Sequence, residues 1–396
     1  MHSQTKTVRF HASLDDVGAE AWDRLFPGDP EDWAFYRAIE ASPPENFKLG
    51  AVTIVNDRTE VIAAVPVFKV DYRLDTPFQG RTRRFADWLH ARIPGLTSIS
   101  VLGLGSPLSD NCSLGFAAEL APAGRLDALQ QLLDWLADEA TRQHANIMAI
   151  KSLGLEARTF APLLAKAGYG EVTSVPVVTL TVHHPSLDAY LQSLKRQHRH
   201  YFRNKLKTRP NLRIEFRRSA AGLEHELVSL YEATLAQSGV SYGDFDRVGS
   251  GYFQSFLEYQ GERAQLMLFW HGETLVSFHL FHAGDRRIIS NKMGMRYPEA
   301  RDLNLYFINW LEIIAFACAH QISEIEMGAT TYKAKMLFGG HFERRYLHFR
   351  FRRDISNRLA RPFHRFFDFE RNDSELQALA AEGPLPGLDE ERTSQS

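Results

Sequence analysis

The stretch from residue 265 to residue 290, QLMLFWHGETLVSFHLFHAGDRRIIS, carries the pattern that decides the fold. Two β-rich runs, Gln265–Trp270 and Thr274–His282, flank the polar turn His271-Gly272-Glu273, which predicts a β-hairpin. The elements predicted after it are a strand, a polar loop, a long helix and a short strand, at Arg286–Gly294, Met295–Asp302, Leu303–His320 and Ile325–Met327. This order is typical of an α/β domain built on one mixed sheet.

The first half of the chain shows the same order. A hairpin is predicted at Lys48–Val55 and Val61–Val70, and a strand, a helix and a strand follow at Ser98–Leu102, Leu126–His144 and Asn146–Ile150. The residues themselves do not repeat, so the duplication is one of pattern. We expect an α/β (α+β) protein with two similar domains, residues 1–182 and 183–355, joined near 183–195. A C-terminal helix and a disordered tail are expected over residues 356–396.

Composition excludes several classes of protein. The 396 residues include 46 basic and 48 acidic side chains, so the net charge of -2 does not favour binding nucleic acid over the whole surface. The two cysteines, Cys112 and Cys318, have no neighbouring Cys or His cluster, so we expect neither a disulfide framework nor a metal site. No stretch is apolar over the roughly 20 residues that span a membrane. A cytoplasmic protein is expected.

The segment Lys195–Arg218 differs most from the average, because it holds ten basic residues and one acid, Glu215. On a helix, Arg196, Arg199 and Arg203 would lie on one face, where they could bind phosphate groups. A solvated face that docks on acidic surface explains the same residues equally well.

Two further segments could carry chemistry. The loop Arg296–Asp302 leads into the helix predicted at Leu303–His320, and the N–H groups at a helix N-terminus can bind anions. Asp302 would cap that helix. The segment Glu326–Gly340, EMGATTYKAKMLFGG, places Gly328, Tyr332 and two lysines just after a strand, at a sheet edge where α/β proteins open their clefts.

The segments LKRQHRHYFRNKL (194–206) and EMGATTYKAKMLFGG (326–340), with the hairpin and long helix between them, resemble the Fem-type branch of the GNAT N-acyltransferase superfamily. This branch includes FemAB-like and cellulose-biosynthesis-type proteins, and the resemblance covers about residues 20–355. It implies tandem GNAT-like domains, each a mixed, mostly antiparallel sheet flanked by helices. The implied activity is transfer of an acyl group from an acyl-CoA cosubstrate to an amine, without a tightly bound cofactor.

The resemblance places the transfer cleft at residues 326–340, where the strand ending at Met327 meets the loop Gly328–Lys333. Glu326 is the candidate for removing the proton of the amine, Tyr332 for protonating the thiolate, and Lys333 for stabilising negative charge. The residues expected to bind the donor are Arg296, Asp302, Leu303, Asn304 and Gly328. The residues expected to bind substrate or phosphate are Lys195, Arg196, Arg199 and Arg203.

One departure from the family is visible. The loop Arg296–Asn304, RYPEARDLN, has no glycine, whereas CoA-dependent members wrap the pyrophosphate with a glycine-containing loop. An aminoacyl-tRNA donor is therefore an alternative, although no long helical hairpin of the kind found in such enzymes is present. A non-catalytic protein that binds an anionic partner through residues 195–207 is a second alternative. The acceptor is expected to be a small molecule or a cell-envelope precursor.

Overall fold

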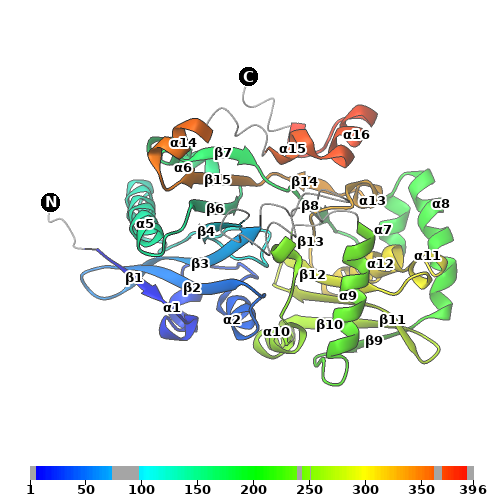
Figure 1. The fold of residues 1–396 in the computed structure, drawn as a ribbon. Coiled ribbons are helices and arrows are strands. Elements are labelled where there is room, and N and C mark those ends of the chain that lie inside the picture. Colours follow the sequence, from blue (N-terminus) through cyan, green and yellow to red (C-terminus); the bar gives the residue numbers. More distant parts are fainter. Residues whose placement is uncertain (1–5, 74–97, 239–242, 250, 361–367, 390–396) are drawn as a thin grey trace. The chain divides into compact units, whose positions relative to one another are not determined.

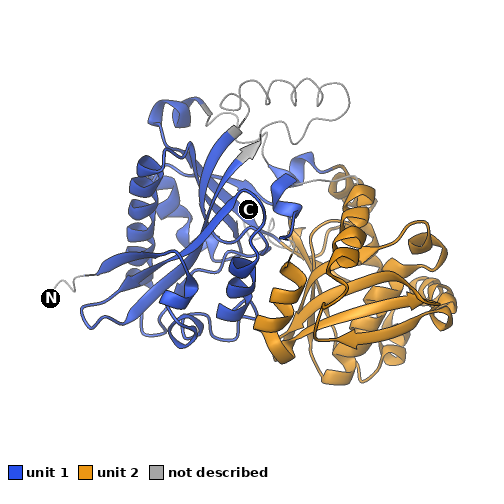
Figure 2. Cartoon of the chain, turned by 60° about the horizontal axis from the view of Figure 1, so that its bottom comes forward, with its two compact units in different colours: residues 1–175, 241–249, 344–373 blue, residues 176–240, 250–343, 374–396 orange. Residues whose placement is uncertain are grey.

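The structure is a computed structural model that describes residues 6–73, 98–238, 243–249, 251–360 and 368–389. The chain divides into two compact units, each built on one sheet (Figures 1 and 2). Unit 1 comprises residues 1–175, 241–249 and 344–373, and unit 2 comprises residues 176–240, 250–343 and 374–396. No helix within the described ranges is both long and apolar enough to cross a membrane.

The sheet of unit 1 has the strand order β1-β2-β3-β4-β6-β15-β7, and the short β5 pairs with β3. Its strands are β1 (Thr7–His11), β2 (Phe47–Val55), β3 (Val61–Arg73), β4 (Ser98–Leu104), β5 (Gly115–Phe116), β6 (Ile147–Leu153), β7 (Gly170–Thr173) and β15 (Tyr346–Phe351). Its helices include α1 (Ala19–Asp23), α2 (Trp33–Ala41), α5 (Pro122–Arg142), α6 (Ala157–Lys166), α14 (Asp354–Ala360) and α15 (Phe369–Asn372). The predicted hairpin β2–β3 is confirmed by an antiparallel ladder.

The sheet of unit 2 has the strand order β14-β8-β13-β12-β11-β10-β9. Its strands are β8 (Val177–Thr181), β9 (Arg213–Arg217), β10 (Ala264–His271), β11 (Thr274–Ala283), β12 (Arg287–Met295), β13 (Glu324–Gly328) and β14 (His341–Glu343). Its helices include α7 (Leu187–Ser193), α8 (Arg196–Lys205), α9 (Glu224–Ser238), α10 (Tyr252–Gln260), α11 (Glu299–Asp302), α12 (Leu305–His320), α13 (Tyr332–Leu337) and α16 (Ser374–Glu382). The hairpin predicted around His271-Gly272-Glu273 is confirmed as β10–β11.

The two sheets share one plan. In each, four antiparallel strands lead to a parallel pair, β4 with β6 and β12 with β13, and a helix connects the two strands of that pair. The next strand in each sheet comes from the other half of the sequence, because β15 pairs with β6 and β7, whereas β8 pairs with β13 and β14. The mixed, mostly antiparallel sheets flanked by helices are as expected.

This exchange changes the expected division of the chain. Residues 173–182 lie wholly inside the expected first domain, 1–182. They form the end of β7 in unit 1 and all of β8 in unit 2, with Pro176, which has no backbone N–H to donate to a ladder, between them. β15 was expected in the second domain, yet it completes the sheet of unit 1. The units therefore differ from 1–182 and 183–355.

The C-terminal segment also differs from the expectation of a disordered tail. Residues 374–389 belong to unit 2, where Leu376, Leu379, Leu385 and Leu388 are buried. The Phe342 N–H of β14 donates to the Pro386 carbonyl at 2.8 Å. Four leucines in a polar segment are enough to pack it against the unit, because burial of each contributes roughly 1.5–3 kcal/mol. Residues 390–396 lie outside the described part.

Helices cover both faces of the sheet of unit 2 (Figure 1). On one face, Phe253 of α10 contacts Phe278 of β11 with ring centroids 5.1 Å apart. On the other face, Trp310 of α12 contacts His279 with centroids 5.0 Å apart. Because successive residues of a strand point to opposite faces, the alternation of Phe278 and His279 fixes which helix each one meets.

The approach of α9 to β12 depends on Gly294. A Cβ at this position would lie 2.8 Å from backbone atoms of Leu230 and Tyr231 in α9. We expect Gly294→Ala to lower the free energy of unfolding by about 1–2 kcal/mol, because the helix must move away from the strand. Urea denaturation measures the free energy of unfolding. The comparison variant is Gly272→Ala in the exposed β10–β11 turn, where a Cβ would meet no atom within 4 Å. The cost of that variant comes only from the backbone φ of +58°. Equal losses in both variants would show that the close approach is not the cause.

Candidate active site

The parallel pair β12–β13 separates soon after it begins. The two strands pair only from Arg287–Glu324 to Ile289–Glu326, although β12 continues to Met295. Beyond that point, Ser290 to Met293 within β12 and residues 328–330 at the end of β13 are partly exposed to solvent, although β12 and β13 are central strands of the sheet. We call this place the strand fork, defined by residues 290–293 and 328–330.

A β-bulge lies at the fork. In the β11–β12 ladder, Leu280 pairs with Lys292 and Phe281 with Ser290, so Asn291 is an extra residue. The bulge directs neighbouring side chains to different helices, as bulges commonly do beside active sites. Ser290 Oγ lies 2.8 Å from His279 Nε2, and Asn291 Oδ1 accepts a hydrogen bond from the Tyr252 hydroxyl of α10.

The segment after β13 adopts an unusual backbone. Gly328, Thr330 and Thr331 have φ values of 72°, 63° and 52°. Two adjacent β-branched residues in the left-handed region are strained, and such strain is concentrated at functional sites. Lys335 stabilises this turn, since its buried Nζ donates to the carbonyls of Gly328 and Ala329 at 2.8 and 2.7 Å.

The electrostatics of this face centre on His279. Its ring is fully buried, and burial together with the nearby Lys335 ammonium lowers its pKa from 6.5 to about 3. The imidazole is therefore neutral at physiological pH. Among the described residues, its Nδ1 has no hydrogen-bond partner.

The N-terminus of α12 differs in detail from the prediction. Asp302 ends the separate short helix α11, and Asn304, with a left-handed φ of 56°, precedes the first residue of α12. Asn304 Oδ1 accepts a hydrogen bond from Lys205 Nζ at 2.7 Å, and the Leu303 carbonyl accepts one from the Thr208 hydroxyl at the same distance. The helix expected to be capped by Asp302 is therefore preceded by Asn304, because Asp302 ends α11 and two further residues, Leu303 and Asn304, separate α11 from α12. Arg296 pairs with Glu226 of α9 at 3.0 Å.

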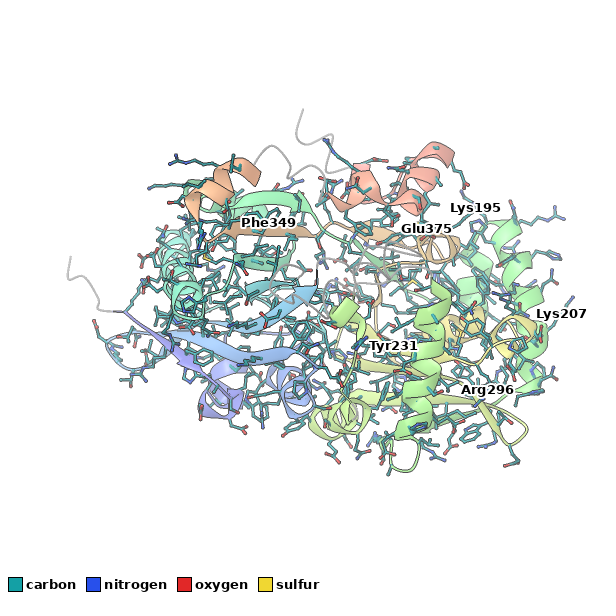
Figure 3. All side chains as sticks on the ribbon, viewed as in Figure 1. Lys195, Lys207, Tyr231, Arg296, Phe349 and Glu375 are labelled. Atoms are coloured by element: carbon teal, nitrogen blue, oxygen red, sulfur yellow. The ribbon has the colours of Figure 1, made fainter. Side chains whose placement is uncertain are left out.

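Residues 196–205 of the basic segment form α8, and Figure 3 labels Lys195 just before this helix and Lys207 just after it. Phe202 is fully buried and stacks on Phe338, with ring centroids 4.4 Å apart, while Tyr201 packs on Phe307 of α12. Arg199 is half-buried and donates to the Gln192 carbonyl at 2.9 Å. The exposed basic residues, which we call the α8 stripe, are Lys195, Arg196, His200, Arg203 and Lys207.

The three predicted segments thus meet within unit 2. Lys205 joins α8 to the start of α12, and Phe202 joins α8 to Phe338 at the end of α13. Of the donor-binding candidates, Leu303 and Asn304 directly precede α12, and Gly328 belongs to the fork.

The three candidates for catalysis are separated. Glu326 is buried and pairs with Arg287 at 3.1 Å, in a cluster with Glu324 and Glu343. The Tyr332 hydroxyl donates to the Pro176 carbonyl at 3.2 Å. Lys333 is exposed and pairs with Glu382 of α16 at 2.7 Å. Tyr332 and Lys333 begin α13.

Four residues of the candidate site were missed or passed over in the sequence. Lys335 was seen only as one of two lysines, and its burial follows from the helical phase of α13, because residues 332 and 335 share a face. His279 and Ser290 lie eleven positions apart, and only the β11–β12 register brings them together. Lys205 lay inside the basic segment without any signal that set it apart.

Residues 193–336 match the family model described as an acetyltransferase (GNAT) domain. The similarity to this family covers less than half of the chain. The matched residues include α8, the fork, α12 and most of α13, so the expected transferase of GNAT type is confirmed at that level. No curated protein sequence matches the chain.

Solved structures show the tandem fold. A structure described as FemX is 12% identical, and the match covers 87% of this chain and 96% of that one with a TM-score of 0.53. A tandem GNAT protein from the clavulanic acid biosynthesis pathway is also 12% identical, with coverage of 88% and 99% and a TM-score of 0.51. At this identity the likeness shows the fold alone, and it agrees with the two sheets of equal plan.

Proposed function

We propose that the protein is an N-acyltransferase that moves an acyl group from an acyl-CoA thioester to an amine at the strand fork of unit 2. The observation that carries this proposal is the early separation of β12 from β13 inside the GNAT domain, with partly exposed residues on both sides. A separated strand pair leaves backbone N–H and C=O groups without a ladder partner, and an extended donor chain can pair with them.

The donor phosphates are assigned to the N-terminus of α12. The first N–H groups of a helix have no acceptor within it, and the helix dipole favours an anion there. Lys205 adds a positive charge at this end and is directed by Asn304. Because no glycine-containing loop wraps the phosphates, Lys205 and the start of α12 supply the charge and the donors together.

The transfer requires little from the side chains. An amine attacks the thioester carbonyl directly, so the site has to position the two reactants, stabilise an oxyanion and accept a proton. Lys335 holds the turn at Gly328 that forms one side of the fork, and we assign the positioning role to this lysine. Glu326, Tyr332 and Lys333 remain candidates for proton transfer and charge stabilisation.

An aminoacyl-tRNA donor is the second candidate, and the observation that favours it is the α8 stripe. The acceptor class, a small molecule or a cell-envelope precursor bearing an amine, is part of the proposal for either donor.

Native mass spectrometry separates the two donors. We expect the full chain to bind acetyl-CoA or a longer acyl-CoA, and Lys205→Glu to weaken that binding by tenfold or more. The control is Lys166→Glu, an exposed lysine at the end of α6 in unit 1. Binding of charged tRNA without binding of any acyl-CoA would replace the first proposal with the second.

Charge reversal on the α8 stripe tests its contact with phosphate. We expect Arg196→Glu with Arg203→Glu to weaken binding of a phosphate-bearing donor by roughly tenfold, because Arg–phosphate hydrogen bonds are charge-assisted. Stability should change little, since both side chains are exposed. Calorimetric titration measures the affinity, with Arg58→Glu and Lys166→Glu in unit 1 as the matched pair. A loss of stability with unchanged affinity would make α8 a structural brace. Arg199 is left intact because it supports the α7–α8 junction.

A further inference from the structure

Ser290 occupies a specific place in the fork. It is the first residue of β12 after the last parallel pair, Ile289 with Glu326, and it directly precedes the bulge at Asn291. Its side chain lies on the face covered by α12, because its neighbour His279 contacts Trp310. Ser290 is partly exposed, whereas Ile289 and His279 are buried. One hydroxyl therefore connects the buried interior to the fork.

The hydrogen bond between Ser290 and His279 has a defined direction. Nδ1 of His279 is buried without a partner among the described residues, and a buried N–H without an acceptor is rarer and costlier than a bare lone pair. The neutral ring therefore carries its proton on Nε2, which donates to Ser290 Oγ at 2.8 Å. His279 cannot then accept the hydroxyl hydrogen of Ser290.

We propose that the Ser290 hydroxyl donates a hydrogen bond to the carbonyl oxygen of the acyl group and stabilises the oxyanion that forms there, with His279 as its positioning residue. This inference rests on the proposed function and adds the residue that recognises the reacting carbonyl. Accepting the hydrogen bond from His279 Nε2 makes the Ser290 hydroxyl a stronger hydrogen-bond donor, since hydrogen bonds in a chain polarise one another.

The transfer step is balanced without a covalent enzyme intermediate. The amine nitrogen forms a bond to the carbonyl carbon, and the C=O π electrons move to the oxygen that faces Ser290. When they return, the C–S bond breaks and the thiolate leaves with the electron pair. The proton lost by the amine ends on the thiolate, and Ser290 and His279 keep their own protons throughout. Acyl-serine formation is disfavoured because a ring protonated at Nε2 cannot remove the serine proton.

The tautomer is measured without any ligand. In a nitrogen NMR spectrum of the full chain labelled at histidine, we expect the His279 signal at pH 7 to show a protonated Nε2 and a bare Nδ1. The signal is assigned by its absence in His279→Gln. A proton on Nδ1 would overturn the inference whatever the donor is.

Recognition of the carbonyl is measured with two unreactive probes. One is a CoA thioether whose side chain carries a ketone, and the other replaces that carbonyl with a methylene group. We expect Ser290→Ala to weaken binding of the ketone about three- to tenfold and to leave the methylene probe unchanged, as loss of one hydrogen bond implies. Ser323→Ala, whose hydroxyl donates to the Arg286 carbonyl at 3.2 Å, is the control.

Kinetics complete the test. With acetyl-CoA, kcat of Ser290→Ala should fall roughly 10²-fold, the scale for loss of one oxyanion donor. His279→Gln, which retains an N–H at the corresponding position, should keep most of the activity that His279→Leu loses. If the wild-type chain binds neither probe, the acyl-CoA donor is wrong and the inference falls with it. If Ser290→Ala keeps the preference for the ketone, only the role of Ser290 is wrong.

Discussion

Lys335→Met is expected to reduce turnover by roughly 10²-fold or more, because the strained turn at Gly328 loses the donor that holds two of its carbonyls. The two bonds at 2.8 and 2.7 Å are made by a buried ammonium, and methionine has a similar length without any donor. Misplacing a reacting group by about 1 Å reduces the reaction rate by about this factor. The measurement is kcat with acetyl-CoA, with a thermal melt to show that the variant is folded.

The comparison variant for this prediction is Lys333→Met on the same helix. Lys333 is exposed and its pair with Glu382 contributes little, so the two variants separate a general effect on α13 from the effect of the buried amine. Since Lys333 is the lysine that the sequence suggested, a loss confined to Lys333→Met would contradict the assignment to Lys335. A melting temperature that collapses only in Lys335→Met would show a structural role instead.

The stability of unit 2 is expected to decrease as the pH is lowered, and His279 is one cause. The pKa of its ring is about 3 in the folded chain and 6.5 when exposed, so between these values the unfolded chain binds a proton that the folded chain does not. Stability is therefore fully present above pH 6.5 and is lost as the pH falls. The slope from this one group is at most about 1.4 kcal/mol per pH unit, or about 2.5 kcal/mol from pH 7.5 to pH 4.5.

His279→Gln isolates that contribution. Glutamine does not titrate and can still donate to Ser290, so the difference in unfolding free energy between the two proteins should change by about 2.5 kcal/mol over this pH range. Urea denaturation at intervals of half a pH unit measures the difference. Parallel curves for wild type and variant would mean that folding does not lower the pKa of His279.

The sequence predicted the local elements well and the long-range pairings poorly. The alternation in Gln265–Trp270 and Thr274–His282 and the polar turn between them were enough for the hairpin, because neighbouring strands and a short turn are specified locally. The exchange of β8 and β15 had no local signal. A strand carries no record of a partner more than a hundred residues away, and both segments are apolar enough for either sheet.

The candidate site was predicted at the level of segments. The charge of Lys195–Arg218 and the glycine at position 328 pointed to α8 and the turn after β13, which the structure brings together with α12. Without the helix α13, nothing in the sequence favoured Lys335 over Lys333. The structure forms α13 at these residues, and its helical turn places the side chain of Lys335 in the interior. Ser290 became visible through the bulge at Asn291, a register feature that no residue pattern predicts.

Hydrogen–deuterium exchange of the full chain with and without acetyl-CoA tests the central claim most directly. We expect acetyl-CoA to slow exchange in peptides that cover residues 290–307 and 328–335, because the donor would pair with the backbone at the fork and with the start of α12. Peptides that cover the equivalent strands β4 and β6 of unit 1 should be unchanged. Protection confined to unit 1, or no protection at saturating acetyl-CoA, would contradict the account.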